Sequence, residues 1–343
     1  MRNRRFRWWE YLLCLLVLTG VLLLCICVGS VNVPLGDTLS ALRSLLPGGA
    51  GGVRYAAIIL SVRLPRVLCV ALVGAALSLS GAAMQGLLRN PLADGSTLGV
   101  SSGASLGAAL AILMGVSLPG FPLGGTAVMS MVFAMLSLLL LLSLAWAMDR
   151  SLATHTIILI GVIFSMFVSS LLSLLITFSG EKLRTITFWT MGSMASSGYP
   201  QAALLLGSLV VFGGVLLGQT RALNAFALGE DHALHLGVSV RRVKLAVMVS
   251  VSCLIGVCVS IGGCIGFVGL ATPHILRMLV GPNHARLLPA SLFGGAVFLL
   301  LCDLLARTAF APLELPIGVV TSIIGAFVFV GVFFRQRKAG GGA

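Results

Sequence analysis

The residues best able to do chemistry are concentrated in one polar segment, residues 219–244. His232 and His235 lie three residues apart there, with Glu230 and Asp231 beside them, and two histidines at this spacing can share a metal ion. A zinc site would also need a cysteine or carboxylate at the matching spacing, and the segment has none. We therefore interpret the histidines as a solvated pair and predict no metal site.

Two further sets of residues, a serine motif and the cysteines, could in principle take part in catalysis or redox chemistry. Gly99–Gly103 reads GVSSG and matches the nucleophile motif of serine hydrolases, but that motif needs a strand-to-helix turn with histidine and acid partners. Here small residues open an apolar stretch, where they favour close helix packing, so we predict no catalytic residue. No C-x-x-C pair occurs, and we interpret the cysteines as buried apolar residues: Cys14, Cys25, Cys27, Cys69, Cys253, Cys258, Cys264 and Cys302.

The composition indicates which elements carry these residues. The 343-residue chain is 58% hydrophobic and 9% charged, with 42 glycines and a mean hydropathy of +1.11. Such values are typical of a polytopic all-α membrane protein. We predict one transmembrane domain, residues 1–338, and a flexible tail, residues 339–343. About ten spans fit: 10–29, 64–87, 95–116, 122–147, 152–178, 199–218, 245–261, 264–281, 288–306 and 317–334. The first is expected to remain uncleaved, and two half-helices are an alternative for the glycine-rich eighth.

The segment 219–244 must lie in water, because its charges are costly to bury in a bilayer. Its apolar residues recur at three- and four-residue steps, which predicts amphipathic helices instead of a linker. A structured polar loop of this kind suits contact with a partner; the alternative is a plain solvated connector. The termini and the loops on their side collect most of the Lys and Arg residues, which predicts that this side is cytoplasmic, together with both termini. This bias and anionic membrane lipid account for the net charge of +13 without nucleic acid.

The source of energy is expected to lie outside this chain. No G-x-x-x-x-G-K-[ST] motif occurs, so the chain has no phosphate loop of its own. Asp303 is the acid placed within a predicted span, and it lies four residues before Arg307, which favours a structural ion pair over a proton relay. A transporter that lacks both an ATP-binding loop and a proton relay would depend on another subunit for its energy. No cofactor is implied.

Four motifs then resemble a known family. They are RLPRVLCVALVGAALSLSGAAMQGLLRNPLADGSTLGVSSG (63–103), LGEDHALHLGVSVRR (228–242), GFVGLATPHILRMLVGPNHARLLP (266–289) and ELPIGVVTSIIGAFVF (314–329). In this order they closely resemble the iron-complex and cobalamin permeases of bacterial ABC importers, over about residues 10–335. The resemblance implies an inverted-repeat, type II importer fold in the cytoplasmic (inner) membrane. It also implies a homodimer with the substrate path along its interface, two cytoplasmic ATP-binding subunits, and an extracytoplasmic substrate-binding protein or lipoprotein.

The same resemblance implies roles for residues. Those expected to couple the permease to the ATPases are Leu223, Leu228, Gly229, Glu230, Asp231, Leu236 and Gly237. Those expected to dock the binding protein, facing water, are Arg63, Arg66 and Arg307. The expected inner gate is Thr154 with His155, although His155 departs from the small hydroxyl residue of the family.

We therefore interpret the chain as a permease without enzymatic activity that imports an iron chelate, with a ferric siderophore favoured. Haem or cobalamin as cargo is an alternative within the same class. An ion-coupled secondary carrier, an intramembrane hydrolase and a structural membrane protein are alternatives of other classes. Co-purification of an ATPase subunit would distinguish the ATP-driven importer from an ion-coupled carrier. A serine essential for turnover would indicate the hydrolase.

Overall fold

The computed structural model describes residues 6–340 except 30, 45–54, 118–123 and 150–152, and within these ranges it is helical and has no strand. A helix satisfies its backbone hydrogen bonds within one segment, which a chain in hydrocarbon requires. The prediction of an all-α membrane protein is confirmed.

Seven helical segments in the described residues are long and apolar enough to cross a membrane. Five are single α-helices, and the other two contain a π-helical turn. They are α1 (Trp8–Cys27), α3–η1–α4 (Ala56–Ile58, Ile59–Arg63 and Leu64–Leu88), α6 (Gly124–Met148), α7 (Thr154–Thr177), α9–η4–α10 (Tyr199–Ser208, Leu209–Gly213 and Gly214–Gly218), α13 (Val240–Gly262) and α15 (His284–Thr308).

The remaining expected spans are occupied by two shorter apolar helices, α5 (Val100–Met114) and α14 (Val268–Val280), and by α16 (Ile317–Gly340), in which the apolar stretch is Ile317–Gly331. Helix α5 follows a short 3-10 turn, η2 (Gly95–Leu98). Every expected span thus contains an apolar helix, while the count of ten crossings stays a prediction. The eighth span is one helix that includes Pro273, not two half-helices.

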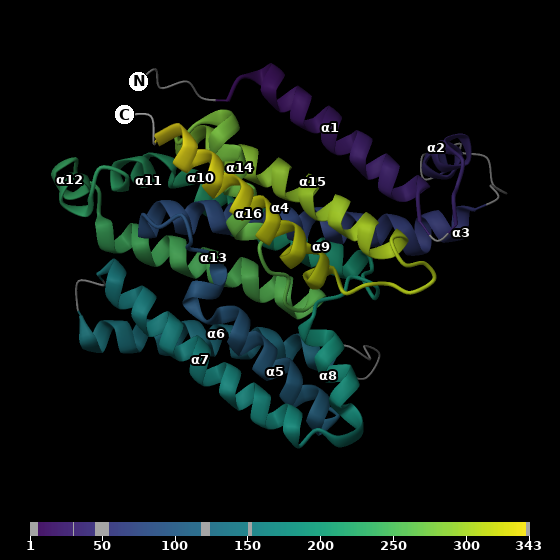
Figure 1. Cartoon of the computed structure of the whole chain (residues 1–343), viewed down its shortest axis with the longest axis horizontal. Coiled ribbons are helices and arrows are strands. Elements are labelled where there is room, and N and C mark those ends of the chain that lie inside the picture. The colour runs from purple at the N-terminus through teal and green to yellow at the C-terminus, as the bar shows by residue number, and fades with distance from the viewer. Residues whose placement is uncertain (1–5, 30, 45–54, 118–123, 150–152, 341–343) are drawn as a thin grey trace.

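Helices α4 and α13 form the centre of the bundle. The apolar window of α4 is 83% buried, whereas that of α1 is 11% buried, so α1 lies at the periphery. Figure 1 shows α1 and α15 on one side of this centre and α5, α6 and α7 on the other. Helix α4 crosses α14 closely: a Cβ atom added to Gly81 would lie 1.8 Å from the carbonyl oxygen of Gly269. Small residues that let backbones approach are typical of helix packing in membranes.

The two ends of the bundle carry different short elements (Figure 1). The start of α1, the end of α16, α11 (Thr220–Phe226) and α12 (Glu230–His235) lie toward one end. Helices α2 (Leu35–Arg43) and α8 (Leu183–Thr190, after the turn η3, Gly180–Lys182), which were not predicted, lie toward the other. Residues 339 and 340 of the expected tail continue α16, and residues 341–343 lie outside the described residues.

Candidate functional site

The predicted coupling segment folds as the two short helices α11 and α12, which lead into α13. Leu223 and Phe226 are fully buried and anchor α11 to the bundle, so the segment is less exposed than the sequence suggested. Leu228, Leu234 and Leu236 are 65%, 56% and 64% exposed. Exposed leucines grouped on a polar segment are typical of a protein-binding surface.

Glycine fixes both ends of α12. Gly229 precedes the helix with φ +118° and Gly237 follows it with φ +80°. Side chains rarely adopt these backbone conformations, so any substitution there strains the chain. Asp231, in the first turn of α12, is exposed. The glycines therefore set the direction in which α12 presents its surface.

Glu230 connects this segment to the rest of the bundle. The Thr154 hydroxyl donates a hydrogen bond to Glu230 Oε1 at 2.8 Å, and Lys244 Nζ donates to Glu230 Oε2 at 2.7 Å. The Lys244 side chain is fully buried, and the Glu230 side chain is 26% exposed. The structure thus brings together a predicted coupling residue and a predicted gate residue, at the first residue of α7. The neighbouring His155 is exposed.

Lys244 is a participant that sequence reasoning missed. It lies at the start of an apolar span, where lysines ordinarily extend to the interface as membrane anchors. A sequence separation of 14 residues from Glu230 gives no helical pairing signal, so only the tertiary structure reveals the contact.

The expectation that Arg63, Arg66 and Arg307 face water is wrong: the side chains of Arg63 and Arg307 are buried, and that of Arg66 is only 11% exposed. Arg63 donates hydrogen bonds to the carbonyl oxygens of Ile26 at 2.6 Å and Cys27 at 3.0 Å, and also to that of Val31. These groups lie at and beyond the end of α1, where helical carbonyls lack intrahelical partners. Arg63 therefore closes the end of a helix.

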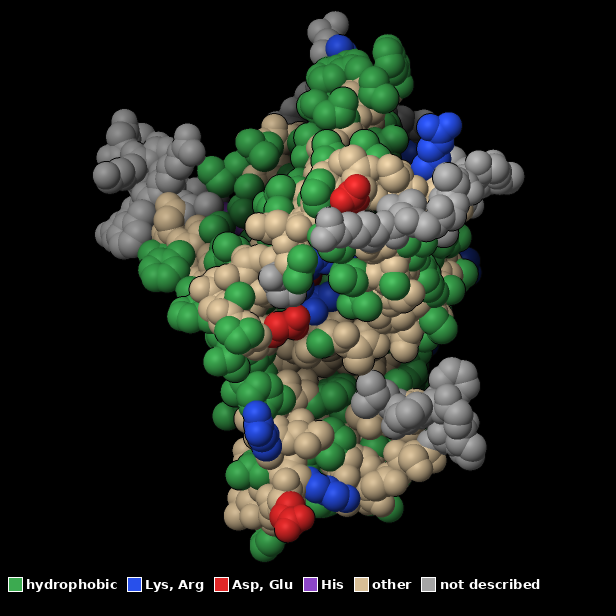
Figure 2. All heavy atoms as spheres, turned by 90° about the vertical axis from the view of Figure 1, so that its right-hand side faces the viewer, with side chains coloured by type: hydrophobic (Ala, Val, Ile, Leu, Met, Phe, Trp, Pro, Cys, Tyr) green, Lys and Arg blue, Asp and Glu red, His purple; other side chains and the backbone are tan. Residues whose placement is uncertain are grey.

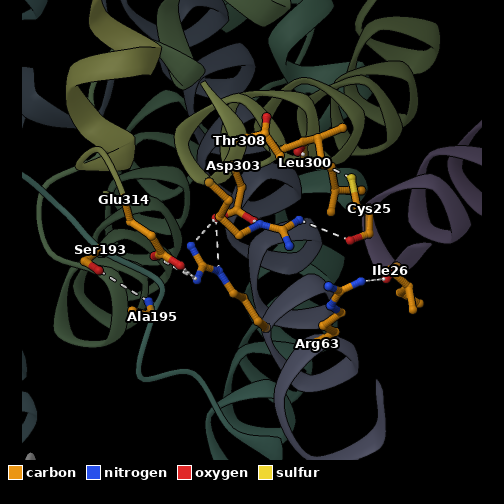
Figure 3. A network of polar contacts seen from close by, with 12 residues as sticks. Cys25, Ile26, Arg63, Ser193, Ala195, Leu300, Asp303, Thr308 and Glu314 are labelled. Atoms are coloured by element: carbon orange, nitrogen blue, oxygen red, sulfur yellow. Dashed lines mark hydrogen bonds and ion pairs between the residues drawn. The ribbon is translucent and has the colours of Figure 1, made fainter. Parts of the chain in front are cut away.

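Arg66 and Arg307 converge on one carboxylate (Figure 3). Asp303 is buried and lies 2.9 Å from Arg66 and 2.9 Å from Arg307, so the predicted pair of Asp303 with Arg307 is confirmed. Arg66 also pairs with Glu314 at 3.0 Å, a carboxylate whose side chain is 47% exposed. Asp303 and Glu314 thus neutralise most of the charge of this arginine cluster within the chain.

These arginines line a cavity of about 260 Å³ together with Glu314. Figure 2 views this end of the molecule and shows a largely uncharged surface, with Lys or Arg beside Asp or Glu at a hollow near its middle. The structure thus gathers the three predicted docking residues at one place, with Arg66 nearest to the exposed carboxylate.

A second cavity, of about 340 Å³, was not predicted. Helices α5, α7 and α8 and the loop before α14 contribute hydroxyl groups and a thiol to its wall: Ser101, Ser102, Ser105, Ser169, Thr190 and Cys264. Ser101 is the serine of the GVSSG pattern, and no histidine occurs among the described lining residues. Gly99 immediately precedes α5, so the pattern starts a helix, as expected, and is not on a strand-to-helix turn.

The fold and these contacts define a multi-pass membrane permease. Residues 15–335 match the FecCD transport family, and the chain belongs to this family. It is therefore an ABC importer permease of the metal-chelate type located in the inner membrane. ATP hydrolysis in this family resides in a separate subunit, and the family implies ATPase and substrate-binding partners.

Curated relatives resemble the chain along almost its whole length. It is 41% identical to the ABC transporter permease protein YvrB of Bacillus subtilis, covering 99% of this chain and 97% of that protein. It is 40% identical to the vitamin B12 import system permease protein BtuC of Klebsiella pneumoniae, covering 99% and 97%. It is 39% identical to the hemin transport system permease protein HmuU of Yersinia pestis, covering 93% and 94%.

Solved structures agree with the fold. A metal-chelate type ABC transporter in an inward-facing conformation superimposes with a TM-score of 0.82 at 34% identity, covering 94% of this chain and 98% of that one. PsaBC from Streptococcus pneumoniae superimposes with a TM-score of 0.54 at 17% identity, covering 80% and 94%, which concerns the fold alone.

Proposed function

We propose that this chain imports a ferric siderophore along the interface between two copies of itself, driven by two cytoplasmic ATPase subunits. Haem and cobalamin are the alternative cargoes, favoured by relatives named for hemin and vitamin B12 transport. All three cargoes are large metal chelates, so the alternatives differ in the identity of the chelate and not in the class of transporter.

The contact of Glu230 with Thr154 carries the mechanistic part of the proposal. Closure of the ATPases would move α12, and the Glu230 carboxylate would pass that displacement to the start of α7 through Thr154 and to α13 through Lys244. Energetic coupling between sites travels through such networks of packed and hydrogen-bonded groups. Asp303, by contrast, is held by Arg66 and Arg307, which argues against its use as a proton carrier in an ion-coupled mechanism.

Two surfaces support a substrate path lined by α7. Its side chains Leu159, Ile163, Met166 and Phe167 are each more than half exposed, so a second copy can cover them. Behind them, the hydroxyl-lined cavity offers hydrogen bonds, and among its described lining residues the groups able to bind a metal are Asp94 and Cys264. No group of three His, Cys, Asp or Glu residues gathers anywhere in the described chain. Such a path suits a chelate that keeps its metal.

The test of function is uptake by vesicles that contain the permease, its ATPase and its binding protein. We expect uptake of a radiolabelled ferric siderophore to require ATP and to persist when a protonophore dissipates the ion gradient. Uptake of haem or cobalamin alone would replace the proposed cargo while retaining the class. Uptake that ceases with the protonophore and ignores ATP would contradict the proposal.

We further propose that the binding protein docks at Arg66. Glu314 is half-exposed and pairs with Arg66, so an acidic partner could exchange with it at the surface. Complementary charges mainly speed association. Arg66→Glu should therefore slow association several-fold at low salt, and high salt should reduce the difference. The exposed Arg184 on α8 at the same end provides a control, Arg184→Glu. Equal association rates for both variants would leave Arg66 with a structural role only.

A further inference from the structure

A cavity of about 790 Å³ has no part in the proposed transport mechanism. It lies where the start of α1, the junction of α10 and α11, and the start of α15 meet. The side chains that surround it are Phe6, Tyr11, Leu217, Thr220, Arg221, Asn224, Ala285, Pro289, Leu292 and Phe293. All three elements are at the ends that the sequence assigns to the cytoplasmic side, so the cavity lies at the level where the spans enter the membrane.

The lining changes from polar to apolar along the spans. Thr220 and Arg221 lie beyond the end of α10, whereas Leu217 is within it. On α15 the lining residues extend from Ala285 to Phe293, a rise of about 12 Å along the helix axis. That length reaches from the headgroup region into the hydrocarbon of a bilayer. The cavity therefore matches a molecule with a polar head and an apolar chain.

One wall of the cavity is aromatic. The rings of Phe6 and Tyr11 lie 4.8 Å apart, and those of Tyr11 and Phe293 lie 6.4 Å apart, both edge to face. Arg286 lies over Phe6 and forms an ion pair with Glu10, which joins the start of α1 to α15. Aromatic residues are enriched at membrane interfaces, where one part of the ring contacts chains and another contacts headgroups.

The charge of the cavity comes from Arg221. Its side chain is exposed and, within the described part of the chain, has no ion-pair partner, and the described lining contains no Asp or Glu. The carboxylate of Glu10, nearby on α1, is already paired with Arg286. An unneutralised arginine at the headgroup end of a cavity favours an anionic ligand, as basic pockets between transmembrane helices do.

We propose that this cavity binds an anionic phospholipid of the membrane. Its phosphate lies at Arg221 and Thr220, and an acyl chain follows Leu217, Leu292 and Phe293. The lipid would fill the space between the peripheral helix α1 and the α11 end of the coupling segment. The proposal does not depend on the transported cargo, because none of these residues has a role in the cargo path.

Native mass spectrometry of the purified full-length chain tests the proposal, with phosphatidylglycerol or phosphatidylcholine added as the probe. We expect the wild-type chain to retain phosphatidylglycerol preferentially and Arg221→Gln to retain about fivefold less, the effect of one basic residue near an anionic surface. Arg242→Gln removes an exposed arginine from α13 on the same predicted side and should retain wild-type amounts. Ala285→Trp, which fills the cavity and keeps the charge, should also lose the lipid.

The outcomes separate a lipid from a free anion. Glycerol 3-phosphate shares the headgroup chemistry but lacks the chains, so it should not displace bound phosphatidylglycerol at equal concentration. Full displacement by glycerol 3-phosphate would overturn the lipid assignment in favour of a small anion. Equal retention of both lipids, or equal losses in Arg221→Gln and Arg242→Gln, would overturn the site itself.

Discussion

At the scale of single residues, Glu230 is the side chain whose contacts best explain a functional assignment. It is one of few acids in the chain, and its two oxygens contact two different spans. A fully buried ammonium such as Lys244 requires an opposite charge or several hydrogen bonds, because its removal from water is costly. Glu230 therefore has two roles: it neutralises the buried charge of Lys244, and it connects α12 to α7 through Thr154.

A double-mutant cycle with Lys244 and a separate variant of Thr154 distinguish these two roles. Glu230→Gln should lower the free energy of unfolding by about 2 kcal/mol, less than for a fully buried pair because Glu230 is partly exposed. Combined with Lys244→Met, the loss should be smaller than the sum of the single losses. Thr154→Val should reduce uptake more than tenfold while ATP hydrolysis continues. Glu181→Gln, which removes an exposed acid in the turn before α8, is the control in both assays. Additive losses would show that the pair is not coupled.

The arginine cluster shows how far residues could be predicted. Asp303 and Arg307 lie four apart on one helix, and this spacing alone indicated their pair. Arg66 and Glu314 are 248 residues apart, and Arg63 finds its carbonyl partners 32 to 37 residues away on α1 and beyond its end. No local pattern encodes such contacts, and arginines at helix ends ordinarily snorkel to water. The sequence therefore predicted that the three arginines lie at one end of the bundle, but it did not predict that their side chains are buried.

At the scale of elements, the crossing of α4 over α14 depends on Gly81. Any side chain there would meet the backbone of Gly269, which cannot rotate away. Gly81→Ala should force the helices apart and lower stability by about 2 kcal/mol. A methyl group added to Gly20 on α1 would have no atom within 4 Å, so Gly20→Ala should be neutral or slightly stabilising. Thermal unfolding in detergent measures both. Equal stability of the two variants would contradict the close crossing.

Leu234 in α12 and Leu236 directly after it are expected to contact the ATPase. Leu234→Asp and Leu236→Asp place charge on an exposed apolar surface, so folding should change little while association with the ATPase subunit weakens at least tenfold. Leu313→Asp is the control, because Leu313 is 74% exposed between α15 and α16. Co-purification of the ATPase at different salt concentrations gives the measurement. Undiminished co-purification of the α12 variants would leave these leucines without a role in coupling.

Elements differ in how well the sequence predicts them. Long apolar runs located the spans because hydrocarbon thickness fixes their length. Helices α2 and α8 lie in connections, where neither length nor continuous hydropathy identifies them. The segment 219–244 was predicted from its three- and four-residue apolar steps, but the steps do not reveal which leucines face the core. The structure assigns Leu223 to the core and Leu228 to the surface.

At the scale of the whole molecule, the direction of insertion is the remaining prediction. The start of α1, the end of α16 and helices α11 and α12 lie toward one end of the bundle (Figure 1). The bias of Lys and Arg assigns this end to the cytoplasm. The loop between α15 and α16 lies toward the opposite end and should face outward, together with the arginine cluster.

Single cysteines at two exposed positions test this orientation. Leu228 and Leu313 are 65% and 74% exposed, so replacement by cysteine should leave the fold intact. In intact spheroplasts a membrane-impermeant maleimide should label Leu313→Cys at once and Leu228→Cys only after permeabilisation. The eight native cysteines are free, so the wild-type chain sets the background. Labelling in the reverse order would show that the topology is inverted. The coupling assignment would then fail as well, because the ATPases could not reach α12.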